Sequence, residues 1–195
     1  MEENDLAYIR TYTGGYFYPA HPELLVPRID DIAHALSQVC RYNGHLFDFY
    51  SVAQHSLLVE AYSTRAMLKE NPNIEEGSLR KFRLQALLHD AAETYLPDMP
   101  SPVKQFLPDF KVLEKKVMAQ IFRCFNIPEN IHAIIKEVDR DIRILEMRYM
   151  QSWKEGKETA DLDALGENQI YAVPPHKSKE LFLDRYYEIR DVFSS

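Results

Sequence analysis

The sequence predicts an all-α fold, a bundle of about six helices preceded by a short β-hairpin. Apolar residues recur at helical spacing through most of the chain, which is the main sequence signal of amphipathic helices. Strand-like residues gather only in a tyrosine-rich stretch near the N-terminus, and prolines and asparagines separate the helical stretches. A chain of 195 residues that is 46% hydrophobic can bury one core, so we expect a single domain over residues 1–195.

The first elements follow from turn and capping residues. Residues 8–19 are expected to form the hairpin, with Gly14-Gly15 at its turn. Prolines then hold an extended connector up to residue 28. A helix is expected from Asp30 to about residues 43–44, and Ser51 is a suitable N-cap for a second helix that ends near residue 68.

The rest of the chain is expected to be helical as well. Residues 30–153 form the proposed helical core, and residues 154–195 add a loop and a C-terminal helix. The expected elements are a helix over 78–95, a rigid proline loop over 97–102, an amphipathic helix over 110–125, a long helix over 129–153, a polar loop over 154–169 and a last helix over 177–193.

Composition excludes several classes of function. The net charge of −7 disfavours binding to a nucleic-acid polymer, which needs a basic face. The two cysteines form no C-x-x-C pattern, which excludes a zinc site built on sulfur. The acidic N-terminus is unlike a secretory signal, and no apolar run reaches the ~18 residues of a membrane span. We therefore expect a cytoplasmic protein without a membrane partner.

The dipeptide His89-Asp90 is the strongest chemical signal in the sequence. It ends an apolar, helix-forming run, and burying a charge costs several kcal/mol unless the charge is paired or bound to a metal. His55 precedes it and Asp139 follows it on other predicted helices. Together these four side chains can offer two imidazoles and two carboxylates to one divalent cation. For each histidine alone, a hydrogen-bonded place in the core is the competing interpretation.

A mixed nitrogen and oxygen ligand set suits several ions. We expect Co²⁺ or Mn²⁺ first, with Mg²⁺, Fe²⁺, Ni²⁺ or Zn²⁺ as alternatives. Four protein ligands on an octahedral ion leave positions for water and substrate, as in catalytic rather than structural sites.

The residues around His89-Asp90 carry a family resemblance. Residues 89–93 read HDAAE and residues 98–104 read DMPSPVK. This pattern resembles the nucleotidase branch of the HD-domain metal-dependent phosphohydrolases, in which an HD-x-x-E helix is followed by a D-[LM]-P-[TS]-P-V-K loop. That branch includes bacterial 5′-deoxynucleotidases and phage dATP triphosphohydrolases. The resemblance covers roughly residues 30–150 and implies an HD-domain helical bundle whose metal ligands are His55, His89, Asp90 and Asp139.

The resemblance also implies catalytic and substrate-binding roles. Glu93 matches the catalytic acid, and along a continuous helix it would share a face with His89 and Asp90. Asp98 matches a residue that contacts the substrate sugar and assists catalysis. Arg41 resembles the phosphate-binding arginine, although its spacing to His55 is about one residue short, and Tyr42 stands where the branch often has a tryptophan against the base.

Lysines supply the other candidate contacts to phosphate. Lys104 lies in the proline loop, and Lys136 lies one turn before Asp139, which would place it over the site. At either position a solvated surface lysine is the competing interpretation. Glu146 follows Asp139 on the same helix face and is expected to support the site by hydrogen bonding rather than by binding metal. His132 is the only histidine between the HD pair and Asp139, which favours one ion over two.

The sequence thus predicts a hydrolase that uses a metal-activated water to remove phosphate from nucleotides. The expected partner is a nucleoside mono-, di- or triphosphate, either a deoxynucleotide or a purine nucleoside analogue, and a homodimer is compatible with the sequence. The alternative is a nucleotide-binding sensor that keeps the HD fold without catalysis. Loss of Glu93 or of a ligand would favour the sensor, and all of these residues are present.

Overall fold

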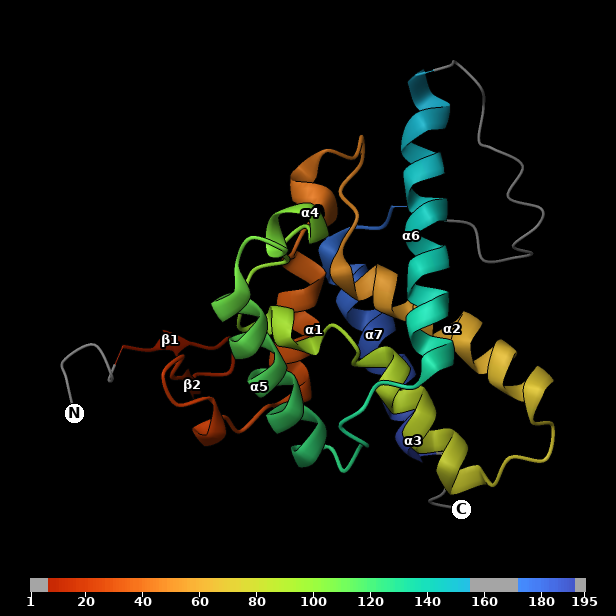
Figure 1. The fold of residues 1–195 in the computed structure, drawn as a ribbon, viewed down its shortest axis with the longest axis horizontal. Coiled ribbons are helices and arrows are strands. Elements are labelled where there is room, and N and C mark those ends of the chain that lie inside the picture. Colours follow the sequence, from red (N-terminus) through yellow and green to blue (C-terminus); the bar gives the residue numbers. More distant parts are fainter. Residues whose placement is uncertain (1–6, 155–171, 192–195) are drawn as a thin grey trace.

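The computed structural model describes residues 7–154 and 172–191, which are mostly helical (Figure 1). Strands β1 (Ile9–Arg10) and β2 (Tyr16–Phe17) pair antiparallel and form the predicted hairpin. Gly14 has a φ of +87° in its turn, a conformation that glycine adopts at little cost. The prediction of an all-α fold with a short N-terminal hairpin is therefore confirmed.

The helices follow one another through short connections. No helix in the described ranges has the length and apolar character that a membrane span requires. The α-helices are α1 (Ile29–Gln38), α2 (Val52–Glu70), α3 (Glu76–Leu87), α4 (Ser101–Lys104), α5 (Pro108–Cys124), α6 (Ala133–Lys154) and α7 (Pro175–Asp191), and the 3₁₀ turns are η2 (Pro22–Leu24), η3 (Arg41–Gly44) and η4 (Ala91–Thr94).

Helix α2 is central and packs against α1, α3, α6 and α7. The predicted N-cap is confirmed, because the Ser51 hydroxyl accepts a hydrogen bond from the Gln54 amide as part of a capping box. Figure 1 shows α5 and the hairpin on one side of the molecule and α6 on the other. Two apolar clusters fill the space between these elements.

The smaller apolar cluster joins α2, α3 and α6. It contains Val59 of α2, Ala86 of α3 and Ile135 of α6. Val59 and Ile135 each lie four positions from a candidate ligand, on the same side of the same helix, and Ala86 lies in the last turn of α3, three positions before His89. Burial of this cluster therefore holds the three chain segments that carry His55, His89 and Asp139.

The predicted helix over 78–95 is wrong at both ends. Helix α3 begins at Glu76 and ends at Leu87, and His89 and Asp90 lie in a turn before η4. The carbonyl of Ala86, which a continuing helix would offer to the amide of residue 90, accepts a hydrogen bond from His89 Nδ1 at 2.9 Å. A side chain that competes for a backbone carbonyl in this way favours the end of a helix.

The predicted helix from Asp30 to residues 43–44 is also too long. Helix α1 ends at Gln38, and Val39 and Cys40 are extended. Cys40 forms an isolated antiparallel bridge with Ser51, which a continuing helix would prevent. Tyr42 and Asn43 then adopt positive φ values of 55° and 51°, which an α-helix excludes. This turn brings Arg41 and Tyr42 toward α6.

Smaller differences concern the later elements. The proline loop contains the short helix α4, helix α6 begins at Ala133 rather than at 129, and α7 begins at Pro175. Helix α5 ends in a Schellman motif, in which the Ile127 amide bonds to the Phe122 carbonyl and Asn126 has a φ of 55°. The predicted polar loop over 154–169 lies, apart from Lys154, outside the described residues.

Candidate metal centre

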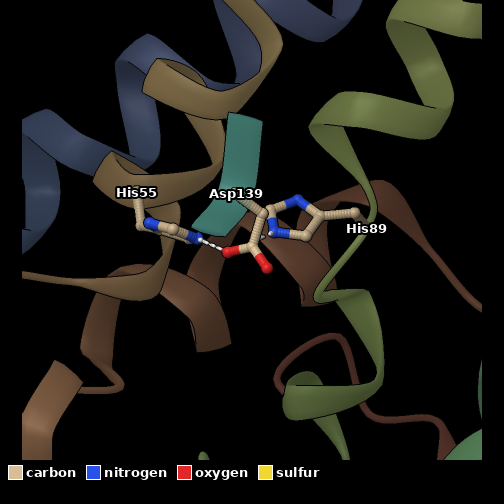
Figure 2. A group of neighbouring side chains, drawn as sticks. All are labelled: His55, His89 and Asp139. Carbon is tan, nitrogen blue, oxygen red and sulfur yellow. Dashed lines mark hydrogen bonds and ion pairs between the residues drawn. The ribbon is translucent and has the colours of Figure 1, made fainter. Parts of the chain in front are cut away.

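Three of the four predicted ligands form a group with the spacing of a metal site. His55, His89 and Asp139 each offer one ligand atom, and these atoms lie within 4.8 Å of one another. His55 Nε2 is 3.1 Å and His89 Nε2 is 3.9 Å from Asp139 Oδ1. In Figure 2 the Asp139 carboxylate lies between the two imidazole rings. The described chain therefore contains a candidate metal-binding triad built from α2, α6 and the turn after α3.

Asp90 lies beside this triad. Its Oδ2 atom is 3.2 Å from His89 Nε2 and 3.7 Å from His55 Nε2. Burial raises the pKa of Asp90, but His89, His55 and Arg41 together lower it by more, so the pKa falls well below its usual range. Burial also raises the pKa of Asp139, but the hydrogen bond with His55 and the charges of His89 and His55 together lower it below its usual value, so this carboxylate is ionised too. Ionised carboxylates are the form that binds cations.

The hydrogen bonds made by Nδ1 of the two histidines turn their Nε2 atoms toward the centre. His89 Nδ1 donates to the Ala86 carbonyl at 2.9 Å, and His55 Nδ1 donates to Glu146 Oε1 at 2.8 Å. Because these acceptors fix the proton on Nδ1, Nε2 of a neutral ring is free to bind a metal. His89 Nε2 is buried and makes no hydrogen bond to the described part of the chain. A buried nitrogen in this state costs free energy unless it has another partner. Two such nitrogens facing two carboxylates fit a divalent ion.

Glu146 holds this arrangement together from α6. Its side chain is 1% exposed and accepts hydrogen bonds from His55, from Arg41 Nε and Nη2 at 3.2 and 2.9 Å, and from the Tyr42 hydroxyl at 2.8 Å. Burial raises the pKa of Glu146, but His55 and Arg41 together lower it to about 2. The carboxylate is therefore charged at neutral pH. A carboxylate that orients a histidine ligand in this way is a common feature of metal sites.

The structure places Arg41 between Glu146 and Asp90, with Tyr42 beside it. Arg41 is 6% exposed, and its Nη1 atom, which does not contact Glu146, lies 3.9 Å from Asp90 Oδ2. The Tyr42 hydroxyl donates to Glu146, and its ring lies 5.4 Å from the Arg41 guanidinium. One edge of the arginine thus faces Asp90 at the candidate centre, whereas the tyrosine hydroxyl contacts Glu146 of α6.

A cavity of about 470 Å³ opens beside the centre. Of the residues predicted from the sequence, His89, Asp90, Glu93, Lys104 and Lys136 line it. Arg41, Tyr42, His55, Asp98 and Asp139 do not, so only two of the four candidate ligands border the cavity. The remaining lining residues are Ala92, Glu114, Lys115, Met118, Ala119, Phe122, Glu129, Asn130 and Ile131.

Glu93 reaches this cavity by a different route from the predicted one. It lies in the 3₁₀ turn η4, which begins directly after Asp90, and its amide donates to the Asp90 carbonyl at 3.0 Å. Glu93 is 7% exposed, and its Oε2 atom has no hydrogen-bond partner among residues 7–154 and 172–191. Burial, and then the charges of Asp90 and Asp98, raise its pKa well above the usual range. The raised pKa favours the protonated form of this side chain.

The two other charged candidates lie at the edges of the site. Asp98 is half-buried, and burial, opposed by Arg41 and reinforced by Asp90, raises its pKa. Lys104 Nζ lies 2.6 Å from Glu114 Oε1, a partner that no motif indicated. Sequence reasoning also missed Lys115, since a lysine on the polar face of a helix has no spacing that separates a cavity lysine from a solvated one.

Comparisons with known proteins give two relatives. No protein-family model matches the chain. The chain is 29% identical to the uncharacterized protein YfdR of Escherichia coli (strain K12) over 192 residues. This alignment covers 96% of this chain and 98% of YfdR. The chain is 44% identical to the uncharacterized protein RCAP_rcc00048 of Rhodobacter capsulatus over 111 residues. This alignment covers 55% of this chain and 53% of that protein. Both names leave the activity open.

Proposed function

We propose that this protein is a metal-dependent hydrolase that removes phosphate from nucleotides. The observation that carries the proposal is the pair of buried imidazoles whose Nε2 atoms face Asp90 and Asp139 at the end of a cavity. His55, His89, Asp90 and Asp139 would hold one divalent ion, with Co²⁺ or Mn²⁺ as the first choice. Such an ion supplies Lewis acidity, which polarises a phosphoryl oxygen and lowers the pKa of coordinated water.

The chain's own residues have separate tasks in this proposal. Glu93 carries a proton inside the cavity and donates it to the leaving oxygen as a general acid. Arg41 Nη1, beside Asp90, adds positive charge next to the transferring phosphoryl group. Asp98 contacts the sugar of the nucleotide, and Tyr42, whose ring lies beside Arg41, contacts its base. Lys104 and Lys136 bind phosphate oxygens.

The substrate class follows from the same residues. A cavity of about 470 Å³ is within the ordinary range for small-molecule sites, roughly 300–1,000 Å³. Basic side chains beside an acidic metal centre suit a phosphate ester or anhydride. We propose nucleoside mono-, di- or triphosphates, with deoxynucleotides or a purine nucleoside analogue as the preferred substrates.

A panel assay tests this function. Phosphate release from ribo- and deoxynucleotides would be followed with malachite green after the protein has been reloaded with Mn²⁺ or Co²⁺. Turnover that requires the metal and is lost in the Glu93→Gln variant supports the hydrolase. Nucleotide binding without turnover of any nucleotide, with the metal bound, supports the alternative of a non-catalytic nucleotide sensor.

A further inference from the structure

The cavity continues beyond the metal centre to a wall that carries three lysines. Lys104 comes from α4, Lys115 from α5 and Lys136 from α6, so three separate elements direct cations to one space. His89, Asp90 and Glu93 line the same cavity at the metal centre. One ligand can therefore contact both the metal centre and the lysines.

Two of the three lysines make no ion pair with the other described residues. Lys104 is paired with Glu114 at 2.6 Å, and Glu129 is paired with Arg123 at 3.4 Å. Asp90 is engaged by His89 at 3.2 Å. No salt bridge of the described residues involves Lys115 or Lys136.

Lys115 and Lys136 are both solvent-exposed and both line the cavity, so their ammonium groups can meet a ligand that enters it. Such cations attract an anionic ligand group, and phosphate oxygens form strong charge-assisted hydrogen bonds with lysine. Their positions on different helices suit a ligand with several negative charges spread along its length. An uncharged nucleoside would use neither ammonium group.

We propose that the lysine wall, made by Lys104, Lys115 and Lys136, is a second phosphate subsite that binds the phosphates adjoining the reacting one. The proposal rests on the proposed function and deepens it, because it assigns nucleoside di- and triphosphates as the substrate class in preference to monophosphates. Lys115 is a binding residue of this subsite, and the reacting phosphate lies at the metal centre.

The test measures binding without turnover. Inorganic tripolyphosphate would be titrated calorimetrically into the metal-free protein in the presence of a chelator. Lys115→Ala and Lys136→Ala are each expected to weaken binding by about tenfold, the effect of losing one hydrogen bond to a charged group. Lys115→Arg is expected to retain binding, and raising the salt concentration is expected to weaken it in the wild type.

Lys116→Ala is the matched control, since Lys116 neighbours Lys115 on α5 but does not line the cavity. Equal tripolyphosphate affinity in the Lys115→Ala and Lys116→Ala variants would overturn the subsite. That result would leave the proposed function standing if nucleotides are still hydrolysed. Conversely, lysine-dependent binding of tripolyphosphate in a protein that hydrolyses no nucleotide supports the subsite and contradicts the hydrolase.

Discussion

Replacing Glu146 by glutamine should destabilise the metal-free protein by about 3 kcal/mol at pH 7. The magnitude follows from the pKa of Glu146, which falls from 4.5 to about 2 on folding. It agrees with the roughly 3–5 kcal/mol measured when one member of a buried ion pair is removed. Glutamine fills the same space but leaves the buried Arg41 guanidinium without its carboxylate. A loss of this size lowers Tm by about 6–12 °C in a domain of this length.

Urea unfolding followed by circular dichroism, in chelator, measures this loss. Because the folded-state pKa is depressed, the stabilisation is fully present above about pH 4.5 and disappears as the pH falls toward 2. The difference between wild type and the Glu146→Gln variant should therefore shrink between pH 5 and pH 2.5. Glu137→Gln is the control, since Glu137 makes only an exposed 3.8 Å pair with Arg140 on the same helix and should cost less than about 1 kcal/mol. Equal losses in the two variants would refute the reasoning.

Three further predictions follow from the candidate centre. Asp90→Ala should reduce phosphate release by more than about a hundredfold, because loss of a residue that only hydrogen-bonds a metal ligand already costs up to about that much. The far-ultraviolet dichroism should stay close to wild type; normal turnover would remove Asp90 from the ligand set. The stability of Glu93→Gln relative to wild type should be greater at pH 8 than at pH 5. A buried carboxyl with a raised pKa makes the wild-type protein less stable as the pH rises above the ordinary pKa of the group; a pH-independent difference in urea unfolding would contradict this. Adding Mn²⁺ or Co²⁺ at a hundred times its Kd should stabilise the apoprotein by about 2.7 kcal/mol, seen as a higher Tm that is absent in His89→Ala; an equal shift in that variant would place the ion elsewhere.

Local patterns were sufficient to predict most helices and the set of candidate ligands. The capping box at Ser51 and the helix that ends before Asn126 follow from residues that act within one or two turns. His55, His89 and Asp139 were identified by chemical type, and their helices converge because apolar neighbours one turn away share a cluster. These features depend on short-range rules that a sequence displays directly.

The remaining features depend on contacts between distant segments. Helical spacing suggested that the helix continues through His89, but the side chain of this residue bonds to the Ala86 carbonyl and the helix ends. The turn at Arg41 was assigned to a helix because its partner, Glu146, lies far along the chain. The cavity position of Lys115 likewise depends on how α5 packs. No local pattern encodes such pairings.

The most direct test of the central claim is the position of a bound ion in a crystal soaked with Co²⁺. We expect an anomalous difference peak at the cobalt absorption edge that lies about 2.0–2.2 Å from Nε2 of both His55 and His89. Carboxylate oxygens of Asp90 and Asp139 should complete the protein ligands. A peak elsewhere on the chain, or full soaking without a peak between these four side chains, would contradict the account.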